Sequence, residues 1–101
     1  MRPILENYKK HTEIYEIKNE RGYLLWRYGT DDNIEVVDMG VDPNYRRQGY
    51  GRDLIDKLSS LANGRIIFLF TKTHNTTAQR FYEKVGFKRG GQMGDNMLYW
   101  K

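Results

Sequence analysis

The chain has 101 residues, a length that predicts a single domain with one modest core. Apolar residues make up 39% and charged residues 30%, which is typical of a folded soluble protein, and the absence of cysteine excludes disulfides, thiolate metal sites and a cysteine nucleophile. The net charge of +4 suits an anionic partner, either a phosphorylated cofactor or a nucleic acid, although ordinary surface charge would explain it equally well.

Neither a membrane span nor a signal peptide is expected. The longest strongly apolar run, residues 66–70, is far shorter than the roughly 20 residues that a transmembrane helix needs. Residues 1–7 lack the apolar core of a signal peptide. We therefore expect a cytoplasmic protein with no membrane partner, consisting of an N-terminal arm over 1–12 and one domain over 13–101.

Three strands are predicted in the first half of the domain. Residues 13–18 alternate polar and apolar, as a half-buried strand does, and Gly22 supplies a turn before a second strand at 23–28. A third strand is predicted at 34–41 after a polar loop. The first two strands should pair as a hairpin.

A helix is predicted next, over residues 49–63, followed by Gly64 in the position of a C-terminal capping glycine. Its apolar face consists of Leu54, Ile55, Leu58, Leu61 and Ala62. A buried strand rich in Ile and Phe should follow at 65–70.

A second helix is predicted over residues 76–85, where Thr76 and Gln79 have the spacing of a capping box. Its apolar face consists of Ala78, Phe81, Tyr82 and Val85. Two last strands are expected at 87–89 and 97–100, around a glycine-rich turn at Gly90, Gly91 and Gly94. The order β-β-β-α-β-α-β-β predicts an α/β fold with a mixed, mostly antiparallel sheet and two main helices.

The segment from Arg46 to Arg52 has the features of an anion-binding loop. It leads into the first predicted helix, whose first N–H groups lack partners within the helix and carry the positive end of its dipole. Gly49 and Gly51 would let a bulky anion approach the backbone, and the arginines add positive charge and planar donors. The loop lacks the Gly-Lys-Ser/Thr ending of a P-loop and the third glycine of a dinucleotide fingerprint.

Two motifs in this sequence resemble those of the GCN5-related N-acetyltransferase (GNAT) family. The run Val41–Gly51 is similar to the family's motif Val-x-Pro-x-x-Arg-x-x-Gly-x-Gly, and Asn75–Phe87 is similar to Asn-x-x-Ala-x-x-Phe-Tyr-x-x-x-Gly-Phe. The resemblance covers about residues 13–101 and implies transfer of acetyl from acetyl-CoA, as co-substrate, to a primary amine in a ternary complex, without a metal.

The resemblance also implies which residues form the site. The strand before the loop would bind the pantetheine arm with its backbone, the loop amides would bind the pyrophosphate, and Tyr82 would protonate the CoA thiolate. The residues implied to bind the cofactor are Met39, Gly40, Val41, Arg46, Arg47, Gln48, Gly49, Tyr50, Gly51, Arg52 and Asn75.

For the general base, Glu35 is the leading candidate, because the histone acetyltransferase branch has a glutamate at the same spacing in a similar context. Asp38 is the alternative, and a chain of waters could also take the proton. Strand alternation would put Glu35 and Val37 on one face and Val36 and Asp38 on the other, so a regular strand could direct only one of the two acids toward the acceptor.

The sequence leaves the acceptor side open. Only about 12 residues precede the predicted hairpin, where the family usually has a strand and two helices. We therefore expect a shallow cleft suited to an amine on a protein or peptide, a cleft completed in a homodimer, or a module that binds acetyl-CoA with little turnover. Nucleic-acid binding has only the basic charge and the aromatic content in its favour.

Overall fold

The computed structural model describes residues 13–101, and the expected arm over 1–12 lies outside the described residues. The described part of the chain forms six strands: β1 (Tyr15–Lys18), β2 (Gly22–Tyr28), β3 (Ile34–Val41), β4 (Ile67–Lys72), β5 (Lys88–Met93) and β6 (Asn96–Trp100). Its helices are α2 (Tyr50–Ala62), α3 (Thr76–Lys84) and the short 3₁₀ turns Thr30–Asp32 and Pro43–Tyr45. Within 13–101 no helix is long and apolar enough to cross a bilayer.

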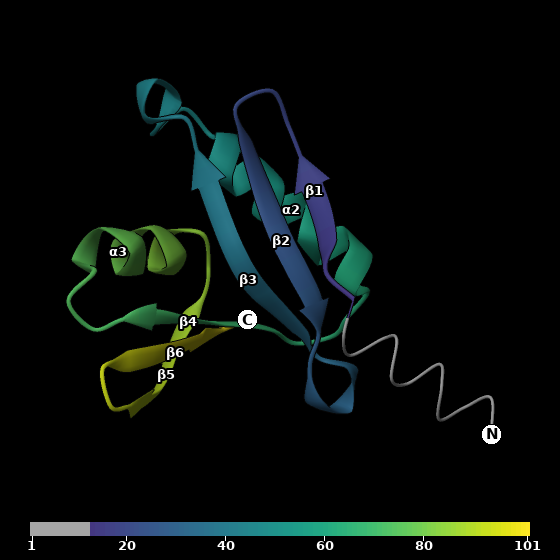
Figure 1. The fold of residues 1–101 in the computed structure, drawn as a ribbon, viewed down its shortest axis with the longest axis vertical. Coiled ribbons are helices and arrows are strands. Elements are labelled where there is room, and N and C mark those ends of the chain that lie inside the picture. Colours follow the sequence, from purple (N-terminus) through teal and green to yellow (C-terminus); the bar gives the residue numbers. More distant parts are fainter. Residues whose placement is uncertain (1–12) are drawn as a thin grey trace.

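The six strands form one mixed sheet in the order β1-β2-β3-β4-β6-β5 (Figure 1). Only β3 and β4 pair in parallel, and the other four pairings are antiparallel. The predicted α/β class, the mostly antiparallel sheet and the order of the main elements are therefore confirmed.

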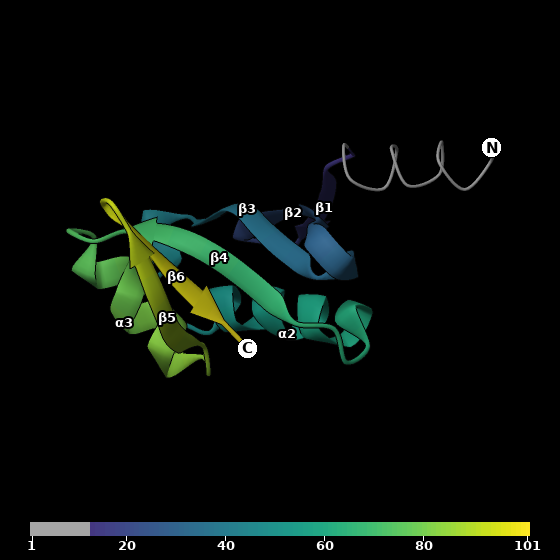
Figure 2. The same cartoon turned by 90° about the horizontal axis from the view of Figure 1, so that it is seen from below.

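Both main helices lie on the same side of the sheet (Figure 2). Helix α2 connects β3 to its parallel neighbour β4, and α3 leads from β4 toward β5 at the far edge. Right-handed crossovers that advance in the same direction across a sheet place their helices on the same face. No helix of residues 13–101 covers the opposite face, which we call the open face.

The core fills the space between the helices and the inward side chains of the sheet. Its fully buried members include Leu24, Leu54, Leu58, Leu69 and Tyr99. Four of the five residues predicted for the apolar face of the first helix are buried, but Leu61 is 56% exposed, so that prediction was wrong for one position. Leu61 is therefore an apolar residue of α2 that does not belong to the buried core.

Two local predictions need correction. The predicted capping box at Thr76 does not form, because Asn75 is the N-cap and its side chain accepts a hydrogen bond from the Ala78 amide at 3.1 Å. The predicted turn beginning at Gly90 does not form either, since β5 continues to Met93 through a register shift between Arg89 and Gln92. A Cβ at Gly90 would lie 2.9 Å from the Leu98 side chain, so glycine is what allows this close approach.

We predict that Leu58→Ala destabilises the fold by about 2–5 kcal/mol, because a fully buried leucine would leave a cavity between α2 and the sheet. Leu61→Ala on the same helix is the matched control and should change stability by less than about 0.5 kcal/mol. Urea unfolding of both variants measures the difference. Equal destabilisation would contradict the described packing of α2.

Candidate active site

The parallel strands β3 and β4 are paired at one end and part at the other. Their register has only two positions, Ile34 opposite Ile67 and Glu35 opposite Phe68. Beyond these, β3 continues to Val41 while it remains paired with β2 on its other side. The backbone of β3 facing β4 therefore has unpaired groups, which need another partner. We call this gap the β3–β4 opening.

A β-bulge in β3 changes which side chains face the open face. Trp26 pairs with Val36, but the preceding residue Leu25 pairs with Asp38, so Val37 is an extra residue in β3. Across this bulge the alternation restarts, and Asp38 falls on the same face as Glu35. The expectation that only one of the two acids could face that side was therefore wrong.

The two carboxylates differ in their partners. Glu35 forms an ion pair with Arg27 at 2.9 Å, and its side chain is only 19% exposed. It also lines a shallow hollow with Tyr28 and Phe68, at the end where β3 and β4 are paired. Arg27 thus already neutralises Glu35, away from the β3–β4 opening.

Asp38 is exposed and held in one orientation. The Tyr23 hydroxyl donates to its Oδ2 at 2.8 Å, and the Met39 amide donates to its Oδ1 at 2.9 Å. The structure gives Asp38 no salt bridge within residues 13–101. Two neutral donors therefore fix this carboxylate while leaving its negative charge for a ligand.

Tyr82 lies on α3, half-buried between aromatic rings. Its ring centroid is 5.6 Å from that of Phe87 and 6.2 Å from that of Tyr99. Burial raises the pKa of the Tyr82 phenol, and the negative charge of Asp38 raises this pKa further. The phenol is thus close enough to Asp38 to feel its charge, and it is protonated at neutral pH.

The first turn of α2 presents free backbone donors. Its first helical hydrogen bond runs from the Asp53 amide to the Gly49 carbonyl at 2.9 Å. The amides of Tyr50, Gly51 and Arg52 therefore have no acceptor within the helix. They point out of the helix at the positive end of its dipole, which is the geometry that binds phosphate oxygens.

The backbone before α2 is shaped by two left-handed residues. Arg47 has φ 64° and Gly49 has φ 88°, so the chain reverses sharply just before the helix begins. Such turns direct successive N–H groups into a concave nest for anions. A Cβ at Gly49 would meet nothing within 4 Å, so its surroundings are open and available to a ligand.

At Gly51 the lack of a side chain serves helix packing, whereas the sequence suggested that it makes room for an anion. A Cβ there would lie 2.9 Å from the ring of Phe81 and 3.2 Å from the Met39 side chain. Gly51 is itself buried. The missing side chain therefore allows α2 to pack against α3 and β3, while the Gly51 backbone amide remains a candidate donor to the anion.

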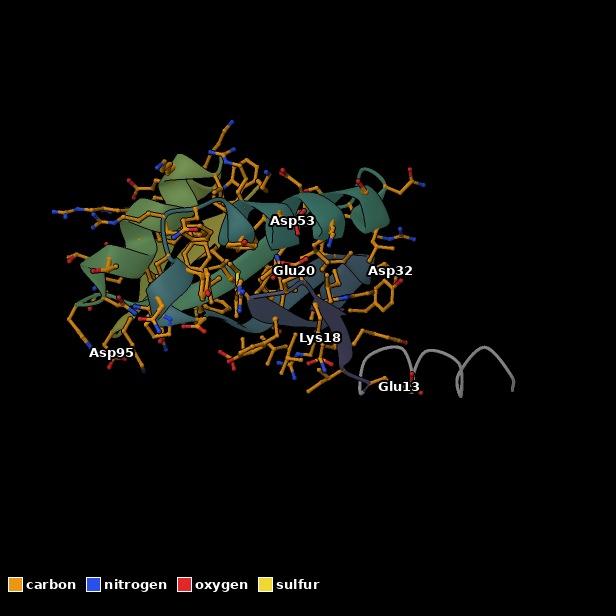
Figure 3. The ribbon with its side chains drawn as sticks, turned by 90° about the horizontal axis from the view of Figure 1, so that it is seen from above. Glu13, Lys18, Glu20, Asp32, Asp53 and Asp95 are labelled. Carbon is orange, nitrogen blue, oxygen red and sulfur yellow. The ribbon has the colours of Figure 1, made fainter. Side chains whose placement is uncertain are left out.

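Residues of the β1–β2 turn contact the loop before α2 and the first turn of α2. The Asn19 side chain donates to the Tyr50 carbonyl at 2.9 Å and to Asp53 at 3.0 Å, and the Arg21 guanidinium lies 3.8 Å from the centroid of the Tyr45 ring. Figure 3 shows Asp53 and the turn residue Glu20, which together line a shallow surface hollow. Asn19 and Arg21 could not be predicted from the sequence, because contacts between residues 24 to 34 positions apart leave no local pattern.

The remaining predicted cofactor residues lie around this region. Met39 packs against the core, and its amide is bound to Asp38. The Val41 carbonyl faces the Arg46 side chain at 3.5 Å, and Arg52 donates to the Lys84 carbonyl at 3.3 Å. Gly40 lies in β3 opposite Tyr23, and Arg47 and Gln48 are exposed. Asn75 caps α3 with its side-chain oxygen.

Residues 13–101 contain no group of three or more His, Asp or Glu side chains arranged to hold a metal.

A family model described as "Acetyltransferase (GNAT) domain" matches residues 9–89. The chain belongs to this GNAT family. The match spans both motifs, the β3–β4 opening and both main helices.

Three relatives illustrate the similarity of this GNAT domain. N-alpha-acetyltransferase RimI of Mycobacterium tuberculosis is 42% identical over 57 residues, which are 56% of this chain and 36% of the relative. A ribosomal protein bS18-alanine N-acetyltransferase of Haemophilus ducreyi is 29% identical, covering 66% of this chain and 57% of the relative. A Bacillus anthracis protein solved with acetyl coenzyme A has a TM-score of 0.68 and 28% identity, covering 78% of this chain and 53% of that protein. The chain thus spans between a third and three-fifths of these relatives.

We predict that Gly49→Leu weakens acetyl-CoA binding at least tenfold, because a side chain would project into the space beside the anion-binding amides. The substitution also strains a left-handed residue, at roughly 1–2 kcal/mol. Gly64→Leu is the matched control, since Gly64 has the same φ of 88° and equally open surroundings after the other end of α2. Isothermal calorimetry compares their affinities. Equal affinities in the two variants would contradict this anion site.

Proposed function

We propose that this GNAT domain transfers the acetyl group of acetyl-CoA to a primary amine of a protein or peptide. One observation carries the proposal: a helix start with unpaired backbone amides follows a strand whose free edge borders the β3–β4 opening. In this arrangement the loop amides bind the pyrophosphate, the free edge of β3 binds the pantetheine arm, and the thioester lies near Tyr82. The similarity to enzymes named as N-acetyltransferases supports the same reaction.

The chemical step requires no covalent enzyme intermediate. The amine nitrogen attacks the thioester carbonyl, the N–C bond forms, and the C–S bond breaks as CoA leaves. One proton of the ammonium group passes to a carboxylate, or through it to water, before the attack. Tyr82 gives its phenolic proton to the departing thiolate, and the second proton released by the nitrogen restores the phenol. The Tyr82 phenol is protonated at neutral pH, as an ordinary tyrosine is, and therefore has a proton to give.

Of the two carboxylates expected to assist the amine, the contacts favour Asp38. Glu35 was the leading candidate, but its ion pair with Arg27 leaves it less able to attract a cationic amine. Asp38 has no cation bound to it in the described part of the chain and influences Tyr82 electrostatically. We propose that Asp38 binds the ammonium form of the acceptor and receives or relays its proton.

The reaction itself is tested by calorimetry with acetyl-CoA, followed by mass spectrometry of peptides incubated with protein and acetyl-CoA. We expect saturable binding and a gain of one acetyl group on a peptide amine. Binding without acetylation of any peptide, polyamine or other amine would support the alternative expected from the sequence, a module that binds acetyl-CoA without turnover. Absence of binding at millimolar acetyl-CoA would contradict both.

We predict that Tyr82→Phe lowers kcat about 10- to 100-fold with little change in acetyl-CoA affinity. This loss lies at or below the usual contribution of a general acid, because a leaving thiol with a pKa near 8–9 needs little assistance. The raised pKa of Tyr82 should keep the wild-type rate from falling until pH exceeds the usual tyrosine value near 10. Steady-state kinetics across pH test both points. An unchanged kcat would remove Tyr82 from the mechanism.

We predict that Asp38→Asn lowers kcat/KM for the amine roughly 10- to 100-fold, the size expected for one charge-assisted hydrogen bond. Glu35→Gln, which removes the neighbouring carboxylate on the same face, should have a clearly smaller effect. The readout is kcat/KM for the amine at saturating acetyl-CoA. A larger loss of kcat/KM for Glu35→Gln than for Asp38→Asn would indicate that Glu35, not Asp38, binds the amine and receives its proton.

A further inference from the structure

Two side chains of opposite character face each other across the β3–β4 opening. From the last paired position, Glu35 opposite Phe68, two steps along β4 reach Phe70. The corresponding steps along β3 reach Asp38, because the bulge adds Val37. Since alternate residues share a face, both side chains lie on the open face. One side of the opening is therefore acidic and the other is aromatic.

The aromatic side is exposed and preorganised. Phe70 is 44% exposed, and its ring lies edge-on to that of Phe68 with centroids 6.2 Å apart. Tyr23 and Trp100 are also partly exposed on this face, at 36% and 37%. Apolar side chains grouped on a surface that no described helix covers, next to a reaction centre, indicate a binding surface.

The open face is also the side from which an acceptor can approach. Helices α2 and α3 cover the other face, and the start of α2 on that side holds the loop amides proposed to bind the pyrophosphate (Figure 2). If the cofactor binds these amides from the helix side, the open face is left for the amine. Asp38 and Phe70 lie on that face, at the opening.

We propose that the open face beside this opening is the docking surface for a polypeptide acceptor, with the amine against Asp38 and an adjacent apolar side chain against Phe70. This inference rests on the proposed acetyl transfer and specifies its substrate. The charge complementarity between Asp38 and an ammonium group fixes the amine. The aromatic side favours a polypeptide over polyamines and amino sugars, which carry charge or hydroxyl groups where Phe70 needs an apolar partner.

The test uses pairs of short peptides, each with one free amine at the N-terminus or on a lysine. The two peptides of a pair differ in the residue after the one that carries the amine, which is Phe in one and Ser in the other. Alanine amide serves as a small acceptor without a neighbouring side chain. We expect the wild type to prefer the Phe peptide of at least one pair by about 5- to 20-fold in kcat/KM, as partial burial of one aromatic side chain would give. Phe70→Ser should abolish that preference and leave the rate with alanine amide within about twofold.

Ile66→Ser is the matched control. Ile66 is 45% exposed, nearly as much as Phe70, and it lies just before β4 at the end of the sheet where β3 and β4 are paired. We expect this variant to keep the wild-type preference. A wild type without preference, or an equal loss of preference in both variants, would overturn the docking proposal.

Acetyl-CoA calorimetry on every variant separates this proposal from the function on which it rests. If the wild type binds acetyl-CoA and acetylates alanine amide but shows no dependence on the neighbouring side chain, only the docking surface is wrong. If it does not bind acetyl-CoA, the proposed function fails and the docking proposal fails with it.

Discussion

The separation of β3 from β4 after two paired residues is the constraint on which the site depends. A parallel pair that stayed in register would satisfy every backbone group and leave no room for a ligand between the strands. Parting instead frees one edge of β3 while β2 still holds the other. Those unpaired groups cost free energy unless a partner binds them, so the fold retains a strand edge suited to an extended ligand arm.

The other parts of the site are organised around this separation. The chain leaves the free end of β3 through a loop that contains the turn Pro43–Tyr45 and enters α2 at Tyr50, so the unpaired amides of the first helical turn lie on the segment that follows this strand. Gly51 lets α2 and α3 pack closely, and α3 places the Tyr82 ring against those of Phe87 and Tyr99. The bulge at Val37 turns Asp38 to the open face. The free amides of α2, the Tyr82 phenol and the Asp38 carboxylate thus come from neighbouring segments held by one core.

Much of the fold could be predicted from the sequence because alternation and helical periodicity are local signals. The features that escaped prediction depend on pairing between distant residues. A single extra residue in β3 leaves the pattern Glu35–Asp38 looking regular, yet it moves Asp38 to the opposite face. Likewise Gly90 and Gly91 suggest a turn, yet β5 continues through them because the residues on either side, Arg89 and Gln92, pair with β6. Leu61 fits the helical periodicity of the core positions but is exposed. The ion pair of Arg27 with Glu35, which shifts attention to Asp38, joins separate strands and has no signature in the sequence.

The most direct measurement of the central claim is amide hydrogen exchange with and without acetyl-CoA. If the free edge of β3 and the start of α2 hold the cofactor, exchange should slow selectively within residues 39–41 and 48–52. The amides of β5 and β6, on the far side of the opening, should exchange at the same rate in both states. Saturable acetyl-CoA binding that leaves the exchange of residues 39–41 and 48–52 unchanged would contradict the account.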